Sequence, residues 1–221
     1  MLSFTEENYL KALFRLTQEN SDEEAGTNEL ASNLGVKPAT ATDMLKRLKE
    51  KKLIDYEKYG KITLTNTGKK SALKIIRKHR LWETFLYEKL DFSWDEVHEV
   101  AEQLEHIQSE KLLVQLDKFL GFPQFDPHGD PIPDKNGKMP LLKAMLLSEV
   151  IVNKRYKLVG VCNHSTAFLQ FLNKTSLTIN NSIEVKEIQA FDKSMTVVIN
   201  NKNQTILSNE VTQNLLVMLI G

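Results

Sequence analysis

The stretch HEVAEQLEH, residues 98 to 106, holds two histidines and three glutamates within nine positions. Successive residues of an α-helix are rotated by about 100°, so positions separated by four, seven or eight residues share one face. The residues with these separations are His98, Glu102, Glu105 and His106. Imidazole nitrogens and carboxylate oxygens are ligands of divalent iron, manganese, cobalt and zinc. The stripe therefore predicts a metal site, with an ordinary solvated helix face as the alternative.

The composition limits what kind of site this can be. With 221 residues, 41% of them hydrophobic and 26% charged, the chain is long enough for more than one domain with a core. The single Cys162 excludes an internal disulfide and a cysteine-cluster zinc site, and we expect it in the core. The sequence has no apolar run of about 18 residues and its N-terminal segment carries acids, so we expect a cytoplasmic protein.

The net charge of zero hides two oppositely charged blocks. Residues 37 to 80 hold 14 Lys and Arg against 4 Asp and Glu, a net charge of +10, and residues 81 to 130 hold 3 against 12, a net charge of −9. A basic block fits a polyanionic partner, and an acidic block with histidines fits a cation. Charged helix faces are also common without either partner.

The basic block overlaps the pattern of a winged helix-turn-helix. An amphipathic helix is predicted over residues 5 to 18, and a short helix from Thr27 leads through a turn at Gly35 to a second helix from Pro38. Residues 53 to 65 alternate apolar and polar types around a Tyr-Gly pair, which predicts a β-hairpin, the wing. The second helix of such a domain enters the DNA major groove. Protein contact is the alternative use of a helix pair with a hairpin.

The positive charge of this segment favours double-stranded DNA as the partner. The candidate contacts lie on the second helix, where they reach bases or phosphates, and beside the hairpin tip, where they reach the phosphate backbone. They are Lys37, Thr40, Thr42, Asp43, Lys46, Arg47, Lys58 and Lys61.

Three further segments follow. Residues 66 to 119 are helical almost throughout, in one long helix and, after the stop DFS, a second over residues 94 to 119, with enough apolar residues to favour a homodimer. Residues 121 to 140 hold five of the six prolines and form an ordered turn-rich segment or a linker. From residue 142, short β-type runs predict a small barrel. The fold class is mainly α with a small C-terminal β-barrel.

Five motifs that follow one another along the chain carry a family resemblance. They are ENYLKALFRL, GVKPATATDMLKRLKEKKLIDYEKYGKITLTNTGK, HRLWETFL, WDEVHEVAEQLEH and DPHGDPIP. With them the chain resembles the metal-dependent transcriptional repressors of the diphtheria toxin repressor family, which includes the manganese transport regulators. Such an ordered set is far more specific than the stripe of histidines and glutamates alone.

The resemblance implies three domains. They are a winged helix-turn-helix DNA-binding domain at residues 1 to 72, a helical dimerisation and metal-binding domain at residues 73 to 140, and a small SH3-like barrel similar to the FeoA module at residues 141 to 221. It further implies a non-enzymatic repressor of metal-uptake genes. Such a repressor binds operator DNA as a homodimer and has no membrane partner.

The resemblance also implies metal ligands. They are Glu102, Glu105 and His106 at a primary site, and His79, Glu83 and His98 at a second site. A barrel residue reaches the second site in relatives, and His164 lies near the matching place, with a plain surface position as the alternative.

The identity of residue 102 bears on which metal is bound. Some iron-responsive relatives have a cysteine where this chain has Glu102, and manganese-responsive relatives have a glutamate. A shell of oxygen and nitrogen ligands favours manganese(II), with iron(II) the other candidate, although zinc, cobalt or nickel also bind such sites tightly in vitro.

Two residues of the first helix depart from the family pattern. Manganese regulators place an aspartate and a glutamate where this chain has Asn8 and Lys11. The amide oxygen of Asn8 is still a possible ligand, whereas protonated Lys11 cannot bind a metal and is expected to pair with an acid of the site.

Two alternative functions stay open at this stage. One is a winged-helix regulator whose metal site has decayed and which binds DNA without metal. The other is a metallohydrolase, which is disfavoured because the chain has no HExxH motif and because the winged pattern would then be unexplained.

Overall fold

A computed structural model describes residues 2–19, 24–56 and 60–220. The chain forms two compact units, each assembled from segments that are distant in the sequence. The first consists of Met1–His79, Glu102–Leu113 and Pro133–Met139, and the second of Arg80–Ala101, Val114–Ile132 and Pro140–Gly221. Within the described ranges, no helix is long and apolar enough to cross a membrane.

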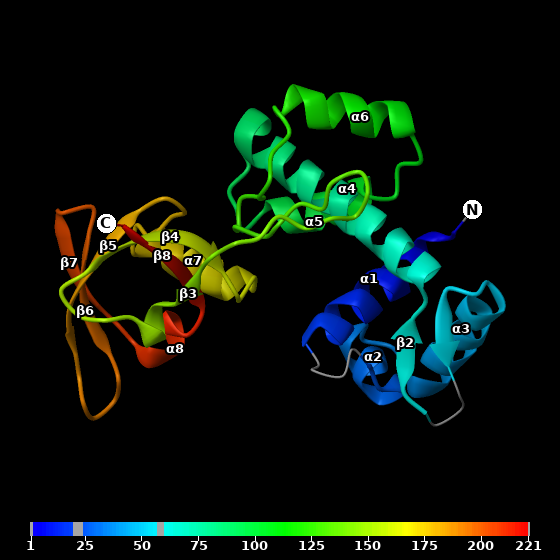
Figure 1. The fold of residues 1–221 in the computed structure, drawn as a ribbon, viewed down its shortest axis with the longest axis horizontal. Helices are drawn as coiled ribbons and strands as arrows, with labels where there is room; N and C mark the ends of the chain where they lie inside the picture. Colours follow the sequence, from blue (N-terminus) through cyan, green and yellow to red (C-terminus); the bar gives the residue numbers. More distant parts are fainter. Residues whose placement is uncertain (1, 20–23, 57–59, 221) are drawn as a thin grey trace. The chain divides into compact units, whose positions relative to one another are not determined.

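The first unit begins with a helix-turn-helix and a wing (Figure 1). Its elements are α1 (Phe4–Glu19), α2 (Thr27–Asn33), α3 (Pro38–Glu50), and the antiparallel strands β1 (Ile54–Tyr56) and β2 (Ile62–Leu64). Gly35, with a φ of +63°, makes the turn between α2 and α3, and Pro38 occupies the first position of α3. The predicted helix-turn-helix and hairpin are confirmed, and the hairpin tip at residues 57–59 lies outside the described residues.

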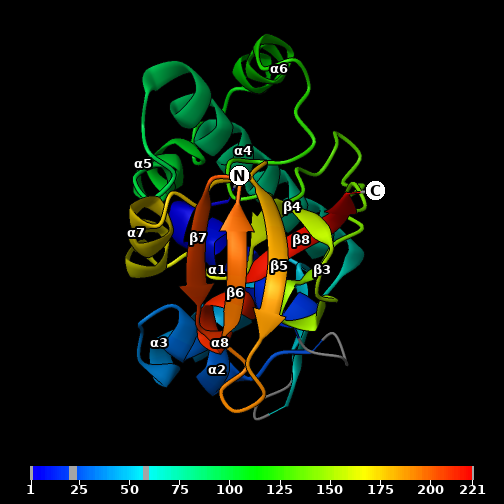
Figure 2. The same ribbon diagram turned by 90° about the vertical axis from the view of Figure 1, so that its left-hand side faces the viewer.

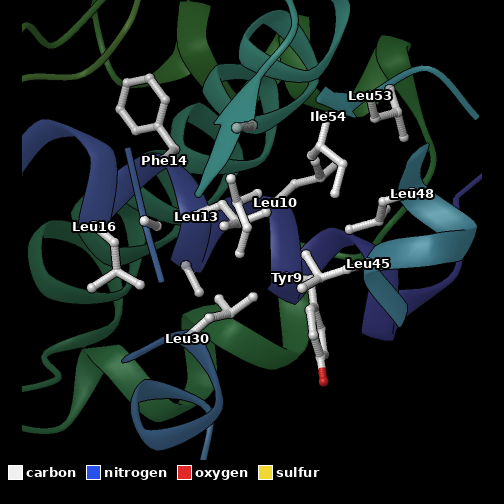
Figure 3. Packing of buried hydrophobic residues seen from close by; sticks show 14 of the residues in the cluster. Tyr9, Leu10, Leu13, Phe14, Leu16, Leu30, Leu45, Leu48, Leu53 and Ile54 are labelled. Carbon is white, nitrogen blue, oxygen red and sulfur yellow. The ribbon is translucent and has the colours of Figure 1, made fainter. Parts of the chain in front are cut away.

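The apolar face of α1 forms the centre of this core. Leu10 and Leu13 have no exposed surface, and they belong to one buried cluster with Leu30 of α2 and Leu45 of α3 (Figure 3). Full burial of one such leucine contributes about 1.5–3 kcal/mol to folding. Core packing therefore fixes the position of α1, and with it the polar residues on its neighbouring stripe.

The long helix α4 (Asn66–Leu90) agrees with the sequence, but the second predicted helix does not form as one piece. It is divided into α5 (Val97–Leu104) and α6 (Glu110–Phe119), so the single helix over residues 94–119 is wrong. Ser109 caps α6, because its Oγ accepts a hydrogen bond from the backbone of Leu112 at 3.3 Å. Glu105 and His106 lie in the turn after α5, so the predicted stripe is not one helix face.

The proline-rich segment is ordered and contains two similar turns. Asp126 begins one turn and Asp134 the other. In each, the aspartate Oδ1 accepts hydrogen bonds at 2.8 to 3.0 Å from the backbone N–H groups two and four residues later. Gly129 and Gly137 follow with φ values of +88° and +82°, a conformation that glycine adopts without strain. The alternative that this segment is a loose linker is therefore excluded.

The second unit contains a six-stranded antiparallel sheet in the order β3-β8-β4-β5-β6-β7 (Figures 1 and 2). The strands of this sheet are β3 (Met145–Leu146), β4 (Arg155–Val161), β5 (Ser182–Ile188), β6 (Met195–Ile199), β7 (Asn203–Leu207) and β8 (Leu215–Ile220). The short helices η1 (Leu147–Glu149), α7 (Thr166–Lys174) and α8 (Asn209–Thr212) lie between them along the chain. Leu158, Val197 and Leu215 are fully buried in its core. Cys162 was expected in this core but is exposed, because the chain leaves the sheet where β4 ends at Val161.

Candidate metal centres and nucleic-acid interface

The first unit contains a group of acids, histidines and one lysine that we call the Lys11 cluster. Its members are Glu7, Lys11, His79, Glu102, Glu105 and His106. The Lys11 Nζ donates hydrogen bonds to Glu102 Oε1 at 2.9 Å and to Glu105 Oε1 and Oε2 at 2.7 and 2.9 Å. The predicted ligands Glu102 and Glu105 thus come together, but around an ammonium group.

The histidines of the Lys11 cluster each contact a carboxylate. His79 Nδ1 lies 2.5 Å from Glu105 Oε2, and His106 Nδ1 lies 2.6 Å from Glu7 Oε2. The other Glu7 oxygen accepts a hydrogen bond from Gln108 Nε2 at 2.8 Å. Glu7 of α1 therefore contacts the turn after α5 directly, which the sequence did not indicate.

Electrostatics at Glu105 is favourable to its charged form. Burial raises the pKa of this carboxyl. The hydrogen bond and charge of His79, together with the Lys11 ammonium, lower the pKa by more than burial raises it, so the net shift is downward. A second lysine, Lys78, is buried nearby. Its burial lowers the pKa of its ammonium, and the charges of Glu7 and Glu105 raise it in part. The acids of this cluster are accordingly balanced by cations of the chain itself.

The second unit contains another group, the Asp126 cluster, made of Glu83, Asp126 and His128. All three residues are buried, and one ligand atom from each lies within 4.8 Å of the others. His128 Nδ1 is 3.8 Å from Glu83 Oε2 and 4.0 Å from Asp126 Oδ1. Helix α4 supplies Glu83, and the first of the two turns supplies the other two residues.

The orientation of the His128 ring places its Nδ1 on the side of the two acids, Glu83 and Asp126. Its Nε2 lies 2.7 Å from the carbonyl oxygen of Trp94, which can accept a hydrogen bond but cannot donate one. This contact requires a proton on Nε2, so Nδ1 is the ring nitrogen that lies on the side of Glu83 and Asp126. A hydrogen bond from the outer ring nitrogen is the usual support of a metal-binding histidine.

The environment of Asp126 disfavours its charged form. Burial, and then the charges of Glu83 and Asp130, raise the pKa of Asp126 well above its ordinary value, and the Arg80 guanidinium lowers it only in part. Arg80 Nε is 3.8 Å from Asp126 Oδ2, and its Nη2 donates to Asp130 at 3.0 Å. Asp126 Oδ2 is buried and accepts no hydrogen bond within the described part of the chain.

The two clusters differ in how well they fit a divalent metal ion. The Asp126 cluster fits such an ion, because it offers two carboxylates and one imidazole, and one oxygen of the Asp126 carboxylate is buried without a hydrogen bond in the described part of the chain. The Lys11 cluster does not fit one as it stands, because the Lys11 ammonium already takes up both carboxylates of the predicted primary site.

The remaining predicted ligands lie around these clusters. His98 Nδ1 is 3.2 Å from Glu83 Oε1, so this pair from the predicted second site comes together. His164 Nε2 lies 3.9 Å from Asp130 Oδ2, and its ring centroid is 5.1 Å from that of His128. Asn8 Oδ1 is buried and makes no hydrogen bond within the described residues.

Sequence reasoning missed Asp126 and His128. The quoted motif DPHGDPIP contains both residues, and a histidine between two aspartates in a buried turn was a signal that the spacing rules for helices did not use.

The candidate DNA-binding side chains are mostly accessible. Those that are exposed are Lys37, Thr40, Asp43, Lys46, Arg47 and Lys61, and Thr42 is partly buried. Lys46 Nζ donates to Asp43 Oδ1 at 3.0 Å, and Thr42 Oγ1 donates to the Pro38 carbonyl at 2.9 Å. Lys58 lies outside the described residues.

Comparison with known proteins agrees with this architecture. Residues 1–62 match the N-terminal DNA-binding domain of iron-dependent repressors, residues 65–134 match their metal-binding and dimerisation domain, and residues 145–219 match the FeoA domain. A solved manganese-dependent transcriptional repressor in complex with manganese is 33% identical, with a TM-score of 0.84 over 97% of this chain and 100% of that one.

Two curated relatives match over shorter regions. The diphtheria toxin repressor of Corynebacterium jeikeium is 30% identical over 129 residues, 58% of this chain and 53% of that protein. A probable metal transport system membrane protein of Chlamydia trachomatis is 42% identical over 76 residues, 34% of this chain and 17% of that protein. The matched regions therefore cover only about half and about a sixth of these relatives.

A winged helix-turn-helix, buried clusters of metal-type ligands and an FeoA-like sheet together define a metal-dependent DNA-binding repressor. The chain belongs to the iron-dependent repressor family, as the sequence motifs predicted.

Proposed function

We propose that this chain represses metal-uptake genes in the cytoplasm, with manganese(II) or iron(II) as co-repressor, by binding operator DNA as a homodimer. The observation that carries the proposal is the Asp126 cluster, three buried residues whose ligand atoms lie within 4.8 Å of one another, in a chain that also has a winged DNA-binding domain. Glu83, Asp126 and His128 would hold the ion, with His98 and His164 as further candidates. The ion would place positive charge beside Asp126, whose pKa is raised by burial and by the neighbouring acids.

Metal dependence of DNA binding follows from linkage. If the operator-binding arrangement of the dimer binds metal more tightly than other arrangements do, metal raises the affinity for DNA and DNA raises the affinity for metal by the same factor. Couplings of this kind are about 1 to 3 kcal/mol, or roughly 5- to 150-fold in affinity. We retain the three-domain division at residues 1–72, 73–140 and 141–221 as the framework for this linkage.

Exposed apolar residues of the second unit support the homodimer. Val114, Phe119 and Phe122, in and just after α6, have exposed fractions of 60%, 64% and 64%. Such a run of large apolar side chains at one helix is typical of a subunit interface.

The test is a DNA-binding titration of chelator-treated protein on the DNA upstream of its own gene. Manganese(II), iron(II), zinc and no metal are compared at one salt concentration, because phosphate contacts make affinity depend on salt. We expect tight binding only with manganese or iron. We expect Asp126→Asn to lose most of this stimulation.

Asp134→Asn is the matched control, because Asp134 plays the same backbone role in a similar turn and belongs to no ligand group among the described residues. Loss of stimulation in both variants would show that the turns matter only for folding. Equal binding with and without metal in the unmodified protein would favour the second candidate, a regulator that binds DNA without metal. The Lys11 ammonium in the predicted primary site is the observation behind that candidate.

A further inference from the structure

The Lys11 ammonium makes the contacts that a bound cation would make. An ammonium group has three N–H donors, and three hydrogen bonds connect it to three carboxylate oxygens of Glu102 and Glu105 at 2.7 to 2.9 Å. The Lys11 side chain is 21% exposed, and that of Glu105 is fully buried. Every donor of this lysine is thus used inside the cluster, and the buried acid is neutralised.

The position of Lys11 is set by the core. Leu10, its neighbour in α1, has no exposed surface, so the backbone that carries Lys11 is held in place. One helical turn earlier, Glu7 contacts His106 and Gln108. Two polar connections, one turn apart, therefore join α1 to the segment Glu102–Leu113 within the first unit.

We propose that Lys11 is a built-in substitute for a metal ion at the predicted primary site, so that this site joins α1 to the segment Glu102–Leu113 without metal. A divalent ion at the same carboxylates would have to displace the ammonium and leave it close to a second positive charge, beside the fully buried Glu105. The Lys11 cluster is then a permanent structural connection. On the proposed function, for which the Asp126 cluster is the metal site, only that second cluster responds to metal.

The first experiment counts manganese(II) ions bound per chain by equilibrium dialysis of the full, chelator-treated protein. We expect one ion in the unmodified chain, lost in Asp126→Asn. Lys11→Glu removes the ammonium and adds a carboxylate, so we expect it to bind a second ion, which Glu105→Gln removes again. The charge-preserving variant Lys11→Arg should bind one ion.

Lys51→Met is the matched control for loss of a lysine that pairs with α1. Lys51 Nζ contacts Glu6 of α1 at 2.7 Å but lies outside both clusters. We expect this variant to bind one ion, like the unmodified chain. A second ion in Lys51→Met would mean that loosening α1, rather than removing the ammonium, opens the site, and would overturn the proposal.

A second measurement needs no variant. The ammonium protons of Lys11, held in three hydrogen bonds, should give a slowly exchanging NMR signal that persists when the protein is saturated with diamagnetic cadmium(II). Loss of this signal, or two manganese ions in the unmodified chain with one removed by Glu105→Gln, would overturn the proposal. No ion in the unmodified chain but one in Lys11→Glu would support it and would count against the proposed role of the Asp126 cluster.

Discussion

Neighbouring residues leave two buried acids of this chain in opposite electrostatic states. Glu105 lies against Lys11 and His79, and its pKa is lowered in spite of burial. Asp126 is buried beside two other acids, with Arg80 no closer than 3.8 Å, and its pKa is raised. A buried carboxylate with too little compensation destabilises the fold until a cation binds or a proton is taken up. The charges of Glu105 and Asp126 are therefore compensated to different degrees by cations of the chain itself.

This contrast predicts the effect of removing the Asp126 charge. Asp126→Asn keeps an Oδ1 that accepts the two backbone hydrogen bonds of the turn, and it removes the poorly compensated charge. We expect the free energy of unfolding of the metal-free protein to rise by about 1 kcal/mol at neutral pH. Stabilisation by added manganese should disappear. Denaturant unfolding in the presence of chelator and of manganese measures both effects.

The variant Asp134→Asn separates the effect of removing the Asp126 charge from the effect of substituting an aspartate in a turn. The Asp134 carboxylate makes the same type of backbone hydrogen bonds, and these lower its pKa rather than raise it. Its substitution should leave the response to manganese unchanged and should give no stabilisation. If instead Asp126→Asn were destabilising in chelator, the Asp126 charge would already be compensated in the metal-free protein.

At the scale of elements, the two similar turns differ in what surrounds their glycines. A Cβ at Gly129 would lie 2.1 Å from the backbone oxygen of Val159, whereas a Cβ at Gly137 would first meet the flexible Leu73 side chain at 3.1 Å. Both glycines have a positive φ, which costs energy for any other residue. The first turn is therefore fixed against the sheet, and this fixes His128 in its place.

Alanine substitutions test this difference. We expect Gly129→Ala to lower the free energy of unfolding by about 2 to 4 kcal/mol, because backbone strain and a backbone clash add together. Gly137→Ala should cost only about 1 kcal/mol. Manganese affinity should fall in Gly129→Ala alone. Equal destabilisation by both variants in thermal unfolding would mean that the close contact between Gly129 and the Val159 backbone does not add to the cost of the substitution.

Local patterns predicted most of the elements correctly. Gly35 and Pro38 mark the turn and the start of α3, and alternating residues mark β1 and β2 as well as the strands after residue 154. The division between α5 and α6 was missed because the apolar spacing continues through it. The capping serine at position 109, just before α6 begins, is only one weak signal in a helical context.

The site was less predictable than the fold. The pairing of Glu102 and Glu105 with Lys11 involves residues more than 90 positions apart, and helix spacing cannot give such contacts. Asp126 and His128 meet Glu83 only because a turn folds back on α4. The sequence could therefore identify residues of the types that bind metals. Which cation lies beside each acid depends on the tertiary structure, which local spacing does not give.

At the scale of the whole molecule, the proposed homodimer would let metal regulate DNA binding through the way in which two chains present their recognition helices. Dimeric helix-turn-helix proteins bind two half-sites about one DNA turn apart, so the dimer interface sets the spacing of the two α3 helices. The exposed apolar residues Val114, Phe119 and Phe122 are the candidate interface in the proposed homodimer. The Phe119 ring also lies 6.1 Å from that of Phe85, which connects α6 to α4.

A charge placed in this surface should separate the subunits. Burying an aspartate at position 114 without a partner is costly, so we expect Val114→Asp to weaken dimerisation on the order of tenfold or more. Phe191→Asp is the matched control, because Phe191 is 99% exposed between β5 and β6 and lies far along the chain from α6. Sedimentation equilibrium measures the association of both variants. If Val114→Asp remains as dimeric as the unmodified protein, the interface lies elsewhere. If the variant is monomeric, we expect it to lose tight operator binding as well, because one winged domain contacts only one half-site.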